Sequence, residues 1–317
     1  MKRLTLALAA AAIAAAPAAY ADDYPSKPIR LIAPFGQGGS TSNAARTMVK
    51  AIEDNDLLDV PIVISYVPGA AGTVGARQVK NAEADGHNLL IWHVAANGAQ
   101  AMGNVDFGPD DFELVAGTDR KCYMLVVRET SEHQTLEELL TAAKENPDTI
   151  IAADNLGGAN HIAAVLAEGS VPGAGFRHVQ FGGTAKTYPA LLGGHAEVNA
   201  SSTSALSSTS TKGLRVLGYM GDERHPDYPD VPTFKELGYD TEFCMYSWWF
   251  MPKGTPEDRV AVMREAMVKA MDTDYMREQT KVQGVEHVIL TGDELTAAME
   301  REKKAISAIG PRLRDAD

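Results

Sequence analysis

Short apolar runs alternate with polar, alanine-rich stretches along the first hundred residues. Residues 29–33 (Ile-Arg-Leu-Ile-Ala) suit a buried strand, and Pro34 ends the run because proline has no N–H to donate to a neighbouring strand. In chain order the pattern predicts a strand over 29–33, a helix over 40–53, a strand over 60–65, a helix to about residue 84 and a strand over 88–94. This β-α-β-α-β order implies a parallel sheet with helices on its faces.

The strand, glycine loop and helix of the opening recur in the middle of the chain, as a strand over 149–153, a loop over 154–161 and a helix to about residue 168. Thr135 and Glu138 form a capping box that opens a helix over 135–145. Further strands are predicted over 112–118 and 122–128, with a polar break at 119–121, and over 176–181, 197–201, 214–220 and 244–251. The strand over 214–220 is predicted to return towards the first lobe. Further helices are predicted over 186–192, 233–237, 256–271, 275–282 and 293–309.

The first glycine loop is the leading candidate for a binding site. Its glycines permit positive φ and a close backbone approach, and its helix start presents backbone N–H groups that favour an anion. The predicted binding residues here are Phe35, Gly36, Gln37, Gly38, Gly39, Ser40, Thr41 and Ser42. The glycine spacing does not fit a dinucleotide-binding fingerprint, and a P-loop would need a lysine that is absent. A tight turn without any ligand remains the alternative.

The beginning of the chain predicts export. Lys2 and Arg3 precede a short apolar core and an Ala-x-Ala site, which is typical of a signal peptide over 1–21 cleaved after Ala21. The mature chain would carry 27 basic against 42 acidic residues, a net charge of −15. Such a charge argues against nucleic acid as a partner but leaves room for a local anion site lined by N–H groups. We therefore expect a soluble periplasmic protein, and a monomer.

Two cysteines remain in a chain bound for an oxidising compartment, Cys122 and Cys244. Both lie in strand-like apolar surroundings, so a disulfide and two buried free thiols both stay open. No metal-binding spacing of Cys or His is present, and no Gly-x-Ser-x-Gly elbow supports a hydrolase. We expect no enzyme activity, no metal and no cofactor.

Several short motifs, weak singly but specific in this order, resemble those of the extracytoplasmic solute receptors of the tripartite tricarboxylate transporter system, also called Bug-type receptors. They are Tyr24 to Arg30 with Pro34-Phe35 and Gly38-Gly39, Pro68-Gly69-Ala70 with Gly72, Ala84-Asp85-Gly86, Gly183 with Leu191 to His195, Pro229 to Thr233, and Pro252 with Gly254-Thr255-Pro256. The resemblance covers nearly the whole mature chain.

The resemblance implies an α/β, type II periplasmic-binding-protein fold: two Rossmann-like lobes, joined by two crossover strands, that close like a Venus flytrap on a small carboxylate. With the order of elements, it predicts residues 22–119 and 222–317 as lobe 1 and residues 120–221 as lobe 2. Transfer of the ligand to large and small membrane permease subunits follows from the family. A co-receptor for a membrane sensor kinase, and a secreted hydrolase, are the alternative functions.

Binding residues outside the first loop are predicted from the second loop and from the ends of neighbouring strands. They are His93, Ala95, Gly157, Gly158, Ala159, Asn160, His161, Gly183 and Thr184. His161 could instead be a capping or surface residue, and His93 a structural one. Trp248 and Trp249 alternate across a strand, so we expect one in the core and allow the other to face the cleft. Trp92 and these two suggest a ligand with an aromatic body.

The chain departs from the usual family pattern at the two loops. It has Ser42 where an acidic residue is usual and Gln37 where proline is usual, and Tyr66-Val67 stands in place of Asn-Arg. The second loop reads Asn155-Leu156-Gly157-Gly158 instead of Gly-x-Gly-Ser. Anchoring of a carboxylate by backbone groups survives these changes, whereas the family pattern gives no guide to the far end of the ligand.

Overall fold

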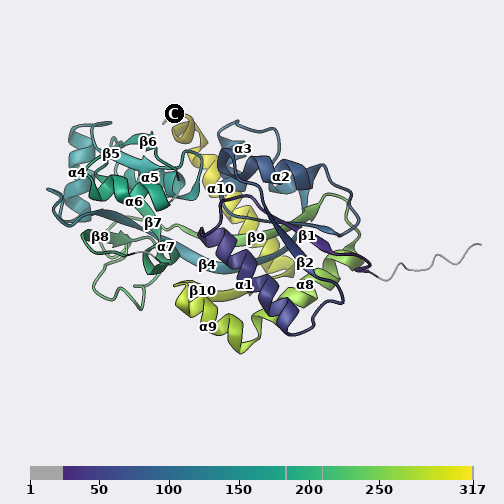
Figure 1. Cartoon of the computed structure of the whole chain (residues 1–317). Helices are drawn as coiled ribbons and strands as arrows, with labels where there is room; N and C mark the ends of the chain where they lie inside the picture. Colours follow the sequence, from purple (N-terminus) through teal and green to yellow (C-terminus); the bar gives the residue numbers. More distant parts are fainter. Residues whose placement is uncertain (1–23, 183, 209, 316–317) are drawn as a thin grey trace, which may run out of the picture.

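The computed structural model describes residues 24–182, 184–208 and 210–315. The expected signal peptide, residues 1–21, and the predicted binding residue Gly183 lie outside this part of the chain. Within it, two groups of strands lie side by side, each with helices on its faces (Figure 1). This is the two-lobed α/β arrangement that the family resemblance implies.

The first lobe has the strand order β2-β1-β3-β9-β4. Strands β1, β2 and β3 are parallel and follow the predicted β-α-β-α-β order, whereas β9 is antiparallel to both β3 and β4. Its strands are β1 (Ile29–Ala33), β2 (Ile62–Tyr66), β3 (Asn88–Trp92), the first part of β4 (Phe112–Arg128), β9 (Cys244–Pro252) and β10 (Glu286–Leu290). Its helices are α1 (Ser40–Asp54), η1 (Ala70–Gly72), α2 (Thr73–Lys80), α3 (Ala95–Ala101), η2 (Pro109–Asp111), α8 (Glu257–Met271), α9 (Asp274–Val282) and α10 (Gly292–Asp315). Two apolar clusters, one containing α1 and α8 and the other α2 and α10, cover the two faces of this sheet.

The second lobe has the strand order β4-β7-β5-β6, with β8 also paired to β4. Its further strands are β5 (Ile151–Asp154), β6 (Arg177–Gln180), β7 (Val198–Ser202) and β8 (Leu214–Tyr219), and its helices are α4 (Leu136–Glu145), α5 (Ala159–Gly169), α6 (Thr184–Leu192) and α7 (Thr203–Ser208). The larger apolar cluster joins α4, α5 and the C-terminal part of α10 to one face of the sheet, and a smaller one joins α6 and α7 to the other.

Strand β4 runs through both lobes, and β9 pairs with it antiparallel at the junction (Figure 1). Cys122 lies directly opposite Cys244 in this pairing, and the two form a disulfide. The structure thus decides the question that the sequence left open: the bond fastens the two junction strands to each other.

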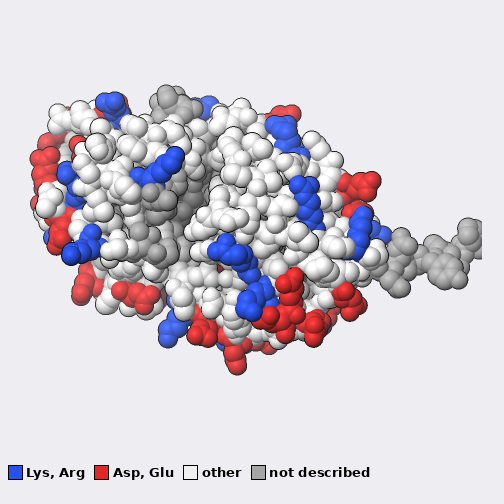
Figure 2. Space-filling view, in the orientation of Figure 1, with Lys and Arg blue, Asp and Glu red and all other residues white. Residues whose placement is uncertain are grey.

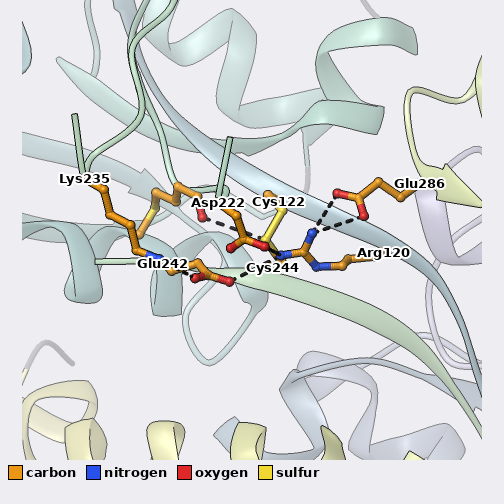
Figure 3. Close-up of a disulfide and its surroundings, with 8 residues drawn as sticks. Arg120, Cys122, Asp222, Lys235, Glu242, Cys244 and Glu286 are labelled. Carbon is orange, nitrogen blue, oxygen red and sulfur yellow. Dashed lines mark hydrogen bonds and ion pairs between the residues drawn. A yellow bond between two sulfur atoms is a disulfide. The ribbon is translucent and has the colours of Figure 1, made fainter. Parts of the chain in front are cut away.

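Arg120 sits beside this disulfide at the centre of an ion-pair cluster (Figure 3). Its guanidinium donates to Glu286 on β10 at 2.9 Å, to Asp222 at 2.9 Å and to Glu242 at 3.3 Å. Because one cation holds carboxylates from three segments, the junction is tied together by charge as well as by the disulfide.

Several predicted elements differ from the structure. The polar break at 119–121 is a bulge inside the single long strand β4, because the backbone continues its pairing with β9 on either side. The strand over 214–220 was predicted to return to the first lobe, but β8 pairs with residues 124–128 of β4 in the second, and β9 returns instead. Residues 233–237 form turns instead of a helix, whereas α3, α7 and β10 were missed.

Candidate functional site

The first glycine loop leads from β1 into α1 and has free helix-terminal donors. The first N–H to bond within the helix is that of Asn43, to the Gly39 carbonyl at 2.9 Å. The N–H groups of Ser40, Thr41 and Ser42 precede it, and helix geometry gives such groups no acceptor inside the helix. They therefore point out of the helix start, where the dipole favours an anion.

Local contacts hold the first loop in shape. Gly38 has φ +88°, the left-handed conformation that glycine adopts without strain. The buried Ser42 hydroxyl donates to the Gly36 carbonyl at 2.8 Å, closing the loop on itself. Ser42 thereby acts as a structural donor within the loop, and residues 36–39 remain exposed.

The second loop leads from β5 into α5 and bonds mostly to itself. The Gly157 N–H donates to Nδ1 of His161 at 3.1 Å, and the Gly158 N–H donates to the Asn155 carbonyl at 2.7 Å. The first helical N–H bond is from Ile162 to Gly158, at 3.1 Å. Because both glycine N–H groups are engaged inside the loop, the outward donors at this helix start include those of Ala159 and Asn160.

His161 is fully buried and supports the loop from beneath. Its ring packs edge-on against His178, with ring centroids 4.8 Å apart. Burial disfavours a charged His178, but contacts of 2.7 Å to Asp154 and 3.4 Å to Glu168 outweigh it and raise the pKa of His178 to about 9. A charged, ion-paired histidine therefore lies behind the second loop.

His93 directly follows β3 and stacks on Phe35 of the first loop, with ring centroids 4.7 Å apart. Burial, with the nearby charge of Lys121, lowers the pKa of His93 to about 3, so its ring is neutral at physiological pH. Its Nδ1 accepts the Ala95 N–H at 3.1 Å, which leaves the proton on Nε2. His93 thus presents a neutral donor beside the first loop, and Ala95 acts through its backbone.

The second loop also meets the first lobe directly. A Cβ built on Gly98 of α3 would lie 3.1 Å from the Gly157 carbonyl, and one on Gly157 would lie 3.8 Å from Cβ of Ala71. The sequence analysis found neither α3 nor η1 as part of the site. The small residues of η1 and α3 were the sequence feature that could have predicted these contacts, because a close approach of the two lobes needs small side chains.

The structure corrects the predicted tryptophan contacts. Trp92 and Trp248 are 0 % exposed and Trp249 is 1 % exposed. Trp248 donates to Glu302 and Trp249 donates to Thr118, so both indoles are held inside the first lobe. The expectation that one of them faces the cleft is wrong, and the three indoles give no reason to expect an aromatic ligand.

The remaining predicted residue that is described, Thr184, is the first residue of α6. A separate hollow of about 510 Å³ lies over α4, but its lining includes Glu137, Glu138 and Glu145, which does not suit an anion. By contrast, mostly uncharged residues border the hollow between the two lobes (Figure 2). Charge therefore favours the region between the lobes over the hollow on α4.

Comparison with known sequences finds a matching family and two relatives that align with most of the chain. A family profile described as tripartite tricarboxylate transporter family receptor matches residues 45–310. The chain is 29% identical to protein BugT of Bordetella pertussis, over 86% of this chain and 85% of that protein. It is 28% identical to a UPF0065 protein encoded in the gbd 5′ region of Cupriavidus necator, over 97% of this chain and 95% of that protein.

Solved structures show the same fold. A TctC solute-binding protein from Polaromonas is 27% identical, with a TM-score of 0.72 over 91% of this chain and 99% of that one. MatC from Rhodopseudomonas palustris, with bound malate, is 24% identical, with a TM-score of 0.75 over 92% of this chain and 99% of that one. R. palustris Rpa4515, with adipate, is 21% identical, with a TM-score of 0.78 over 93% of this chain and 98% of that one.

Proposed function

Since the chain belongs to the tripartite tricarboxylate transporter receptor family, we propose that it captures a small organic acid in the periplasm and delivers it to a tripartite permease. In the proposed mechanism the ligand carboxylate is held between the two glycine loops, and the lobes close over it. Residues 22–119 and 222–317 would form one moving body and residues 120–221 the other, with large and small permease subunits as partners.

The observation that carries this proposal is the pair of strand-loop-helix turns, one in each lobe. Outward N–H groups at Ser40 to Ser42 and at Ala159 and Asn160 offer donors from two helix starts, which favour a negative charge. The neutral His93 ring adds a donor next to the first loop. Backbone N–H groups left unpaired on closure are costly, so the ligand must supply acceptors, and the helix dipoles favour acceptors that carry a negative charge.

The nature of the ligand follows the same logic. Two solved proteins of this fold hold malate and adipate, respectively. Both ligands are small carboxylic acids, and a carboxylate accepts hydrogen bonds with both oxygens without needing a metal. The matching family is described as a receptor family and the Polaromonas structure as a solute-binding protein, and we propose that this chain likewise has no catalytic activity. In the described part of the chain, no helix is long and apolar enough to cross a membrane.

A thermal-unfolding screen of organic acids tests the proposal. A ligand present at about 100 times its dissociation constant should add about 2.7 kcal/mol of stability, enough for a clear shift of the melting temperature. Neutral sugars of similar size are the matched controls and should give no shift. Stabilisation by sugars with no response to any carboxylate would overturn the proposal.

A further inference from the structure

Lys121 is a buried lysine at the junction of the lobes, outside both glycine loops. Burial lowers the pKa of its side chain, and the nearby charge of Asp119 opposes that shift, so a bound anion would favour the charged form. The residue is 2 % exposed, and its Nζ donates to the Ser247 hydroxyl at 3.2 Å. An ammonium group has three donors, and burying it is costly unless acceptors satisfy them. Among the described residues no carboxylate lies within ion-pair distance, 4.0 Å, of this nitrogen. The ammonium therefore has capacity for another acceptor.

A bulge in β4 sets the direction of this side chain. Between the pairs Thr118–Ser247 and Lys121–Met245, β4 advances by three residues while β9 advances by two. The extra residue is accommodated at Asp119, whose φ is +54°. In an unbroken strand a residue three positions after Thr118 would point to the opposite face. Because of the bulge, Lys121 points to the same face as Thr118 and Ser247.

This is the face on which the two loops lie. In the first lobe, the same face of β9 carries Trp249, which packs in the cluster beneath α1. In the second lobe, the same face of β4 carries Tyr123, which packs in the cluster beneath α5. Lys121 lies between these two clusters along the strand, and so on the floor between the helix that starts at Ser40 and the one that starts at Ala159.

Neighbouring polar groups confirm the position. Trp92 pairs with Trp248, so the next step along these antiparallel strands brings His93 beside Ser247, the residue that Lys121 contacts. The charge of Lys121 also acts on His93, lowering its pKa together with burial. Lys121 thus adjoins the ring that stacks on Phe35 of the first loop.

Resting on the proposed function, we propose that the Lys121 ammonium, with the Ser247 hydroxyl, is a second anion site that takes the distal carboxylate of a dicarboxylate. The first carboxylate would lie at the helix starts, and the second would reach the floor of the cleft. The site then selects diacids over their monoamides of equal length, because only a diacid supplies a second negatively charged acceptor for the ammonium.

Asp119 is the competing structural explanation. Ser247 also contacts this buried carboxyl group, whose pKa is raised by burial in spite of the opposing effect of Lys121. If the lysine served only to balance Asp119, ligand selectivity would not depend on it. The two explanations therefore differ in ligand preference, which can be measured directly.

Calorimetric titration with matched ligands separates them. The probes are succinate, glutarate and adipate, each compared with its monoamide, which keeps the length and loses one charge. The unsubstituted protein should bind its best diacid at least about 10-fold tighter than the matching monoamide, as expected for a charge-assisted hydrogen bond. Equal affinities would overturn the inference without any substitution.

The variant Lys121→Met should lose most of the diacid preference while binding the monoamide within about 3-fold of the original affinity. Lys269→Met is the matched control, because Lys269 is exposed and pairs with Glu265 on α8, and it should keep the preference. A Lys121→Met protein that still prefers the diacid would overturn the inference.

If that variant fails to fold, Ser247→Ala should weaken the preference in the same direction, and an unchanged preference would overturn the inference. Failure of every acid to bind the unsubstituted protein would overturn the proposed function itself.

Discussion

The glycines of the first loop differ in whether their position would tolerate a side chain. Gly38 has φ +88° with nothing within 4 Å of its Cβ position, so its constraint is conformational. Gly39 has φ −76°, and a Cβ there would meet the Gly36 carbonyl at 3.6 Å, an ordinary contact. Similar glycines in one loop therefore have different roles.

We predict that Gly38→Ala destabilises the protein by about 1 kcal/mol, because the left-handed conformation strains any residue with a Cβ. Gly39→Ala is the matched control, and it should cost less because neither its φ nor its surroundings oppose a methyl group. Urea unfolding of the two variants gives the comparison. Equal unfolding free energies would contradict the assignment of strain to Gly38 alone.

At the scale of elements, the buried charges of the second lobe fix α5 against β5 and β6. His178 on β6 contacts Asp154 at the end of β5 and Glu168 near the end of α5, and Arg312 of α10 donates to Glu168 at 2.9 Å. A charged histidine in this position joins three consecutive elements, β5, α5 and β6. Its protonation should therefore support the loop that α5 follows.

This cluster predicts a pH dependence of stability. The ordinary pKa of 6.5 applies to His178 in the unfolded chain and about 9 in the folded one. The stabilisation is complete below pH 6.5 and is lost as the pH rises through 9, so the free energy of unfolding should fall across this window by on the order of 3 kcal/mol. His178→Gln should flatten the slope, whereas a change of the exposed His195 to Gln should leave it intact. Denaturant unfolding at several pH values measures both, and an equally steep slope in His178→Gln would refute the assignment.

For the whole molecule, the disulfide and the Arg120 cluster hold the two junction strands together (Figure 3). The bonded cysteines are 122 residues apart, so the bond closes most of the second lobe and its connections into one loop. Cross-links that close long loops restrict the unfolded chain most, and native disulfides commonly contribute about 2–4 kcal/mol. The fold of both lobes should depend on this bond.

We predict that the double variant Cys122→Ser with Cys244→Ser loses about 2–4 kcal/mol of unfolding free energy. A reducing agent should destabilise the original protein by a similar amount and should not affect the double variant. Guanidinium unfolding with and without reductant provides the four curves needed. Coincident curves for all four would mean that the bond contributes nothing to stability.

The sequence alone determined the local elements and the family. Periodicity and turn residues gave β1, α1, the capping box at Thr135 and both glycine loops, because these features depend on neighbours within a few positions. The order of short motifs was enough to indicate the receptor family, which the profile match confirms. The predicted binding residues of the two loops remain predictions. The first helix starts at Ser40, where the sequence placed it, and the second starts at Ala159, inside the loop predicted over 154–161.

Only the tertiary structure decided what happens between strands that are distant in sequence. The pairing of Cys122 with Cys244, the burial of Trp248 and Trp249, and the bulge that directs Lys121 all depend on the register of β4 with β9. That register is set by contacts across more than a hundred residues, which no local pattern encodes. In the sequence, Lys121 belongs to the polar stretch 119–121, which predicted a break between two strands. The register of β4 with β9 instead keeps Lys121 inside one long strand, on what we infer to be the floor between the lobes.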